Sequence, residues 1–230
     1  MLTLAAWLLN DLLKNTMKKL FSILTPGLAP VLVLLASCQN NSADSVKEAK
    51  QATAEKTDSA RRVEQPVDTS VLPVTKDDAD FIISAADGGM LEVELGRLAQ
   101  TNAASQGVKD FGNLMIRDHS KGGDEIKSLV SSKRVVLPAA LSNDHQKKVE
   151  ELQKKKGAEF DKSYIDFMVG DHREDIRAFE KAAKDAKDPD IKAFANNHLP
   201  MLHQHLDSAE KLLRKLKKVN FPPIAPTKGY

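Results

Sequence analysis

The chain has 230 residues, of which 41% are hydrophobic and 29% are charged, and its formal net charge at pH 7 is +2. This mixture is typical of a globular protein and excludes a chain that is disordered or membrane-embedded along its whole length. Residues 1–37 contain three lysines and one aspartate, so the totals of 34 basic and 32 acidic residues become 31 and 31 without them. A chain with balanced charge gives no electrostatic reason to expect nucleic acid as a partner.

The first predicted element is a bacterial lipoprotein signal peptide in residues 1–37. From Met17 the chain reads MKKLFSILTPGLAPVLVLLASC, where two lysines precede an apolar run and small residues lie directly before Cys38. The pattern resembles lipoprotein signals, which implies cleavage before Cys38 and attachment of lipid to its sulfur. The alternative is an uncleaved membrane helix, which the prolines and the glycine in the run disfavour. Residues 1–16 precede this signal, as expected if the true start is Met17.

A lipid on Cys38 would anchor the chain to a membrane, because each buried CH₂ group contributes about 0.8 kcal/mol. We therefore expect a protein of the bacterial cell envelope. Gln39 follows the cysteine, and by analogy with well-known lipoproteins the absence of aspartate there favours the outer membrane, with the domain facing the periplasm. No disulfide within the chain is possible, because Cys38 is its only cysteine.

Residues 38–76 are predicted to form a disordered tether, because this polar stretch has too few large apolar side chains to offset its ordering entropy. At most a transient helix is expected near residues 45–60. The folded domain is predicted to span residues 77–218, with aspartates at its start that suit a helix N-terminus. Residues 219–230 are predicted to be an extended tail.

The first long helix is predicted to begin near Asp80. Its buried stripe contains Gly88, Gly89 and Gly96, and such small residues let a neighbouring helix approach closely, although each one weakens the helix. Ser105 is the predicted N-cap of the second helix. The buried stripe of that second helix consists of Val108, Phe111, Met115, His119, Gly122, Ile126 and Leu129.

Pro138 breaks the helical pattern, and a short charged helix over residues 144–156 is expected to end at Gly157. Two more long helices follow. Pro189 suits the first turn of the last helix, and Pro200 inside that helix is expected to kink it. The buried positions expected on the third and fourth helices are Phe160, Tyr164, Met168, His172, Ile176, Phe179, Ile191, Phe194, His198, Leu202, His205, Ala209, Leu212 and Leu216.

Four amphipathic helices with one longer connection in the middle predict an all-α protein. The expected architecture is a four-helix bundle built from two helical hairpins, with a short extra helix in the central connection. A repeated pattern marks the second and third helices: FGNLMIRDH at residues 111–119 and YIDFMVGDH at residues 164–172. Both copies place an aromatic residue, a methionine and a closing Asp-His pair at the same spacing, as matched supports for two imidazoles would.

Each predicted stripe contains a polar residue where an apolar one is expected. These residues are Glu92, His119 and His172 on the first three helices, and both His198 and His205 on the fourth. Since each helical residue rises about 1.5 Å, their separations from the intervening turns place them within about one turn of a common level. The sequence therefore predicts that these side chains converge in the bundle.

A carboxylate and two or three imidazoles that converge in a dry core form a site for a transition metal ion such as Fe, Zn or Cu. The candidate ligands are Glu92, His119, His172 and His205, with Asp118, Asp171 and His198 as alternative ligands or hydrogen-bond acceptors. The alternative is a buried hydrogen-bond network that only locks the helices together. Met115 and Met168 are expected to fill the core rather than to bind the metal, and His145 and His203 are expected on the surface.

Four blocks carry a family likeness: ADGGMLEVELGRLA, VKDFGNLMIRDHSK, FDKSYIDFMVGDH and IKAFANNHLPMLHQHL. Together they resemble the domain-of-unknown-function 4142 family over about residues 77–216. The resemblance implies a ferritin-like four-helix bundle, often in a lipoprotein described as an outer-membrane protein, and it implies no established reaction. Di-iron members of the wider superfamily carry Glu on two helices and Glu-x-x-His on two others. This chain departs from that pattern, because its second and third helices carry Asp-His pairs, so a site for one metal ion or for none is expected.

Three functions follow from these observations. The first is an envelope lipoprotein that holds a metal ion for storage, buffering or stress protection. The second is a non-catalytic module that binds an envelope protein partner, and the third, least compatible with the residues, is a di-iron oxidase. No catalytic residue is predicted, because the chain has no Gly-x-Ser-x-Gly motif and its only cysteine is the lipid site.

Overall fold

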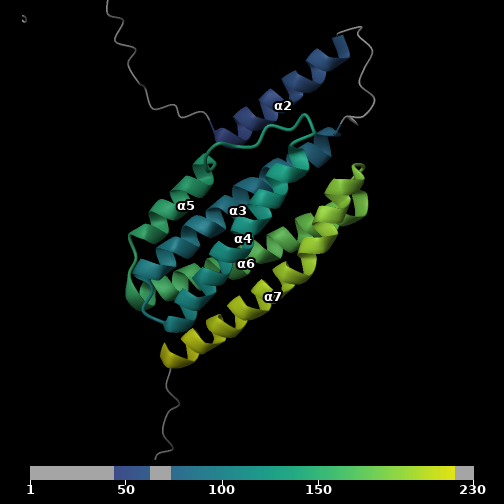
Figure 1. The fold of residues 1–230 in the computed structure, drawn as a ribbon. Coiled ribbons are helices and arrows are strands. Elements are labelled where there is room, and N and C mark those ends of the chain that lie inside the picture. The colour runs from purple at the N-terminus through teal and green to yellow at the C-terminus, as the bar shows by residue number, and fades with distance from the viewer. Residues whose placement is uncertain (1–43, 63–73, 221–230) are drawn as a thin grey trace, which may run out of the picture. The chain divides into compact units, whose positions relative to one another are not determined.

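The computed structural model describes residues 44–62 and 74–220, and every regular element in these ranges is a helix. The helices are α2 (Ser45–Arg62), α3 (Lys76–Asn102), α4 (Gln106–Val130), α5 (Asn143–Gln153), α6 (Gly157–Asp185) and α7 (Pro189–Asn220) (Figure 1). All of them belong to the second of two compact units, Ser42–Tyr230. The predicted signal peptide, the lipid site at Cys38 and the tail from residue 221 lie outside the described residues.

The four long helices form two hairpins. α3 packs along α4 and α6 packs along α7, while contacts of α3 with α6 and of α4 with α7 join the two hairpins (Figure 1). The short helix α5 lies in the central connection and contacts α3 and α6. The prediction of an all-α, ferritin-like four-helix bundle with an extra helix in its central connection is therefore confirmed.

Two apolar clusters fill the core, and the candidate site residues lie where they meet. Met115 and Met168 are fully buried in the second cluster, as expected of core methionines. On α4, α6 and α7, the candidate residue lies in chain order between a member of one cluster and a member of the other, whereas Glu92 on α3 lies between Leu91 and Leu95 of the second cluster. The flanking pairs are Met115 and Ile126 on α4, Met168 and Ile176 on α6, and Leu202 and Ala209 on α7.

The glycines of α3 serve two different purposes. A Cβ atom on Gly96 would lie 2.6 Å from the carbonyl oxygen of Gly112, so at this level α3 and α4 approach as closely as predicted. A Cβ atom on Gly88 would meet nothing within 4 Å, and one on Gly89 only the His119 carbonyl oxygen at 3.9 Å. The prediction of close approach is therefore wrong for Gly88, which has open space beside it, whereas Gly89 lies at ordinary van der Waals distance from the backbone of α4.

The start of α4 is stabilised from another helix. Ser105 is the N-cap, as predicted, but its side chain makes no capping hydrogen bond. Instead, the backbone N–H groups of Ala104 and Ser105 donate to the carboxylate of Asp161 on α6, at 3.1 and 2.8 Å. A carboxylate at this position also complements the positive end of the helix dipole. This contact ties the two hairpins together at one end of the bundle.

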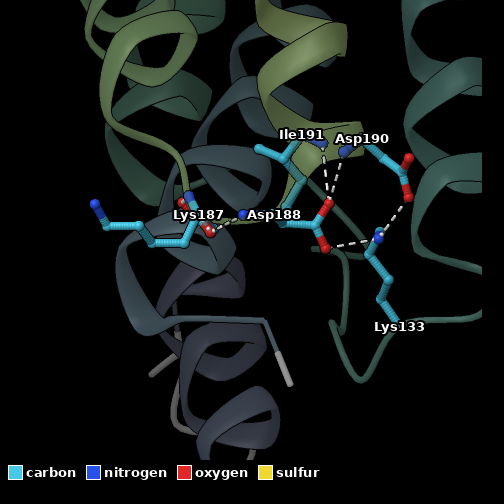
Figure 2. A network of polar contacts seen from close by, with 6 residues as sticks. Lys133, Lys187, Asp188, Asp190 and Ile191 are labelled. Atoms are coloured by element: carbon cyan, nitrogen blue, oxygen red, sulfur yellow. Dashed lines mark hydrogen bonds and ion pairs between the residues drawn. The ribbon is translucent and has the colours of Figure 1, made fainter. Parts of the chain in front are cut away.

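The start of α7 carries a polar network (Figure 2). Asp188 caps the helix by accepting hydrogen bonds from the N–H groups of Asp190 and Ile191 at 3.0 and 3.1 Å, and α7 begins at Pro189 as predicted. Lys133 bridges the carboxylates of Asp188 and Asp190 at 2.7 and 2.9 Å. The helix then continues without interruption past Pro200.

Residues 45–62 differ from the predicted tether, because they form the helix α2. Ala49 and Thr53 are buried in the structure, and the Thr53 hydroxyl accepts a hydrogen bond from the backbone N–H of Val136 at 2.9 Å. Together with Val46, these residues lie at helical spacing and give a narrow face that packs against the bundle. Among the described helices, none combines the length and the apolar character that crossing a bilayer requires.

Candidate metal centre

The four candidate ligands meet in the core, one from each long helix. Glu92 on α3, His119 on α4, His172 on α6 and His205 on α7 are all buried, with exposed fractions between 0% and 9%. The two oxygens of Glu92 lie between two imidazoles: Oε2 is 2.6 Å from His119 Nδ1, and Oε1 is 3.4 Å from His172 Nε2. His172 Nε2 is also 3.3 Å from His205 Nδ1.

Hydrogen bonds fix which nitrogen of His172 and of His205 carries its proton. His172 Nδ1 lies 3.1 Å from the backbone oxygen of Met168, and His205 Nε2 lies 3.0 Å from Oδ2 of Asp118. A carbonyl and a carboxylate oxygen can only accept, so each of these ring nitrogens must be the N–H donor. The two nitrogens that face each other, His172 Nε2 and His205 Nδ1, are therefore both bare acceptors in the neutral rings.

Two bare nitrogens at 3.3 Å repel each other unless a cation lies between them. A shared proton is disfavoured near neutral pH, because burial lowers the pKa of His172 to about 3 and that of His205 to about 4. A metal ion fits the spacing. With bonds of about 2.0–2.1 Å, two nitrogens on one tetrahedral centre lie about 3.3–3.4 Å apart.

Burial also suppresses charge on the other two members of the cluster. Burial raises the pKa of Glu92 well above its ordinary value, with a further contribution from nearby Asp175. Burial lowers the pKa of His119 to about 4. Oε1 of Glu92 and Nε2 of His119 have no hydrogen-bond partner among the described residues. The three imidazoles are thus neutral and can bind a metal without first losing a proton, whereas Glu92 loses its proton when it binds as a carboxylate.

The predicted auxiliary residues fall in three different places. Asp118 supports the site by accepting from His205, and hydrogen bonds from Arg117 and His205 outweigh its burial and lower the pKa of Asp118. Asp171 lies in the site, since one of its oxygens is within 4.8 Å of ligand atoms of Glu92 and His172. His198 lies outside the cluster, with Nδ1 donating to the Phe194 oxygen at 2.8 Å.

One nitrogen from each of His119, His172 and His205 lies within 4.8 Å of the other two, so these histidines form a second group able to hold a metal ion. His172 belongs to this group and also to the group with Glu92 and Asp171. Because its Nδ1 is committed to the backbone, its one free nitrogen can serve one ion. The two groups therefore overlap in one site rather than forming two sites.

Sequence reasoning missed Asp175 and, within the described residues, the unpaired hydroxyl of Tyr164. Burial raises the pKa of Asp175 to about 6, although His119 opposes this effect. The buried Tyr164 hydroxyl and Asp171 Oδ2 both lack a hydrogen-bond partner among the described residues. Asp175 lies one helical turn after His172, and this spacing is the signal that could have identified it.

The surface prediction for His145 is wrong, while His203 is exposed as expected. His145 is partly buried, with Nδ1 only 2.8 Å from Oδ2 of Asp87. Asp87 itself is buried, and its other oxygen accepts from the N–H of Ser142 at 2.8 Å. The buried carboxylate of Asp87 needs a cationic partner, which explains why α5 turns His145 inward.

The chain is similar to a protein family and to a solved structure. A profile of the family described as "Domain of unknown function (DUF4142)" matches residues 63–212. Among curated proteins, no relative matches the chain. A crystal structure of a DUF305 fragment from Deinococcus radiodurans is similar, with a TM-score of 0.56 and 11% sequence identity, over 63% of this chain and 99% of that chain. At this identity the likeness shows a common helical fold alone.

Proposed function

Because the chain belongs to the DUF4142 family, whose description names no function, we propose a function from the site itself: binding of one transition metal ion. The ligands are His119, His172 and His205, with the carboxylate of Glu92. The observation that carries this proposal is the 3.3 Å separation of His172 Nε2 and His205 Nδ1, two nitrogens whose ring partners leave both without a proton.

The alternative, a hydrogen-bond network that only locks the helices, fits these contacts poorly. A network needs a donor between each pair of acceptors. The N–H groups of His172 and His205 are already used by Met168 and Asp118. The single proton of an uncharged Glu92 can be donated to only one of the two imidazoles beside it. A metal ion would supply the missing positive charge to both facing nitrogens and to Oε1 of Glu92.

Imidazole nitrogens with one carboxylate suit Zn, Fe or Cu, and geometry alone does not select among these ions. A single buried ion suits buffering or delivery of a metal, or protection against metal stress, better than storage of many ions. No step of a reaction is assigned to these residues.

The same proposal places the site in the bacterial envelope. The lipoprotein signal before Cys38 supports anchoring to a membrane, with Gln39 favouring the outer membrane and a domain that faces the periplasm. A metal-binding bundle there would meet ions that enter from outside the cell. An envelope protein that accepts or donates the ion is a further possible partner.

Metal analysis tests the proposed function. We expect the full-length protein, purified in detergent, to hold about one transition metal ion per chain, whereas a His172→Ala/His205→Ala double variant holds almost none. His203→Ala is the matched control, because His203 is exposed on α7, the helix that also carries His205. Negligible metal in the wild-type protein, both as purified and after incubation with Zn, Fe or Cu, would overturn the proposal.

A further inference from the structure

A cavity of about 840 Å³ opens beside the candidate metal centre and reaches Glu92 and His119. Its outer wall includes exposed residues such as Glu94 and Asp124, while Glu92 and Leu202 in its inner wall are only 1% exposed. The cavity therefore runs from the surface to the buried site. Its volume lies within the range of about 300–1,000 Å³ that is usual for small-molecule sites.

Glycines on both sides keep this cavity open. Gly88 and Gly89 of α3 and Gly122 and Gly123 of α4 all line it. A Cβ atom on Gly88 or on Gly123 would meet nothing within 4 Å. Their φ angles are not positive, and glycine is a poor helix former, so neither a turn nor a close helix approach requires these two glycines. What they provide is space.

The charges at the rim are already paired with each other. Arg97 Nη1 lies 3.8 Å from Glu94 Oε2, and Lys127 Nζ lies 2.8 Å from Asp124 Oδ1. These four rim residues therefore offer no uncompensated charge to attract an ion. Further inside, the walls are mostly apolar, and they include Val93, Ile126, Phe179, Phe194, Met201 and Leu202.

The inner polar groups narrow the choice of ligand. The buried Glu92 and the partly buried Asp175 present two carboxyl groups and no cationic side chain to the inner cavity, so an anionic ligand would lose its hydration there without an opposite charge from these residues. The apolar walls disfavour a strongly hydrated cation. What remains is a neutral molecule with an apolar body and one polar atom, and a metal ion at the Glu92 and His119 edge would accept a lone pair from that atom.

We propose that this cavity binds a small, neutral, mainly apolar organic molecule whose single nitrogen or oxygen donor takes the place of the Glu92 carboxylate on the metal ion held by the three histidines. The apolar body packs between α3 and α4, in the space beside Gly88 and Gly123. The inference rests on the proposed metal function and adds a ligand class to the same site.

The test uses the full-length protein in detergent, loaded with Co²⁺, whose visible spectrum reports changes in coordination. We titrate it with 4-phenylimidazole and with imidazole, which share a donor atom and differ in the apolar body. We expect 4-phenylimidazole to bind at least tenfold more tightly, because its phenyl ring leaves water for the cavity.

Cavity-filling variants separate the body of the probe from its donor. Gly88→Leu is expected to weaken 4-phenylimidazole binding at least tenfold and to leave imidazole binding within about twofold. Gly123→Leu on the opposite wall repeats the test if Gly88→Leu does not fold. Gly170→Leu is the matched control, because Gly170 is exposed on α6, lies outside the cavity and also has nothing within 4 Å of its Cβ position.

The outcomes distinguish the two proposals. If the wild-type protein takes up no Co²⁺, the metal function fails and the ligand inference fails with it. If Co²⁺ binds but the two probes bind equally well, only the ligand inference is overturned. The same holds if Gly88→Leu and Gly123→Leu fold, take up Co²⁺ and bind 4-phenylimidazole as tightly as the wild type.

Discussion

Two buried polar clusters in this bundle satisfy their hydrogen bonds to different degrees. At the start of α7, both oxygens of Asp78 accept from the backbone N–H of Lys187, and Oδ2 also accepts from that of Asp188. Asp188 accepts from two N–H groups and pairs with Lys133 (Figure 2). At the midplane, by contrast, Glu92 Oε1 and His119 Nε2 are buried and have no hydrogen-bond partner within residues 44–62 and 74–220.

The difference follows from where each cluster lies. The first turn of a helix has free N–H groups, so a carboxylate there finds several donors. In the middle of a helix the N–H groups are already used, and only side chains can serve. Accordingly, donors such as Lys133 outweigh burial and lower the pKa of Asp188, whereas burial raises the pKa of Glu92. The end cluster is complete by itself, and the midplane cluster has capacity left for a ligand.

The largest expected difference between the two clusters is in their response to acid. An unfolded histidine titrates near about pH 6.5, whereas burial, together with the neighbouring histidines, lowers the pKa of His172 to about 3. Below pH 6.5 the unfolded chain binds a proton that the folded chain does not. His172 therefore contributes stability that is present above pH 6.5 and is lost as the pH falls. This contribution decreases by about 3 kcal/mol between pH 6.5 and 4.

Urea unfolding of the metal-free protein at pH 6.5 and pH 4 measures this loss. His172→Gln is expected to remove about 3 kcal/mol of the pH-dependent loss, and His203→Gln at the exposed position is expected to remove none. Equal losses of unfolding free energy in the wild type and in His172→Gln would show that the folded protein accepts the proton at this site. The two clusters would then not differ in their response to acid.

Metal is expected to stabilise the protein only through the midplane cluster. At a free metal concentration 100 times the Kd, the free energy of unfolding rises by about 2.7 kcal/mol, which raises the Tm by roughly 5–11 °C for a domain of this size. Thermal unfolding with and without a chelator measures the shift. His203→Ala should keep it and His172→Ala should lose it; a shift that persists in His172→Ala would move the metal to another place.

Asp78→Ala is expected to cost about 2 kcal/mol, because it leaves the buried N–H of Asp188 without its acceptor. Denaturant unfolding measures this loss. Metal content should stay at the wild-type level, since Asp78 belongs to the end cluster only. A variant that loses metal while its helix content is unchanged would contradict the separation of the two clusters.

The smallest expected effect on stability is that of Glu92→Gln. In the metal-free protein the raised pKa of Glu92 already favours the uncharged acid, which a glutamine resembles, so the free energy of unfolding should stay within about 1 kcal/mol of wild type. Metal affinity should fall at least tenfold, as measured by competition with a chromophoric chelator. A large destabilisation with unchanged affinity would make Glu92 a structural residue like Asp188.

The sequence predicted the helices and the level of the site because both depend on regular spacing. Apolar stripes give the buried faces, and the constant rise per residue let the heights of Glu92, His119, His172 and His205 be compared without coordinates. The predicted hairpins follow from the same pattern together with the long connection before α6.

Other features could not be predicted, because they depend on distant partners. The stripe of α2 is short and polar, and it becomes a helix face only against the bundle. Asp161 accepts a hydrogen bond at the start of a helix more than fifty residues away. The sequence around His145 is typical of an exposed helix, and the contact with Asp87 turns His145 inward. Gly88 and Gly96 look alike in the sequence, yet Gly88 borders a cavity and Gly96 lies against the backbone of α4.

The distribution of the four candidate ligands has a mechanical consequence. Glu92 and His119 come from the hairpin of α3 and α4, and His172 and His205 come from the hairpin of α6 and α7. An ion bound by all four would therefore crosslink the two hairpins. Without the ion, each hairpin could open locally by itself, and backbone amides at the contact between the hairpins would exchange their hydrogens quickly. With the ion, opening would require breaking coordination bonds. The backbone amides of the two hairpins would then exchange their hydrogens only when both hairpins open together.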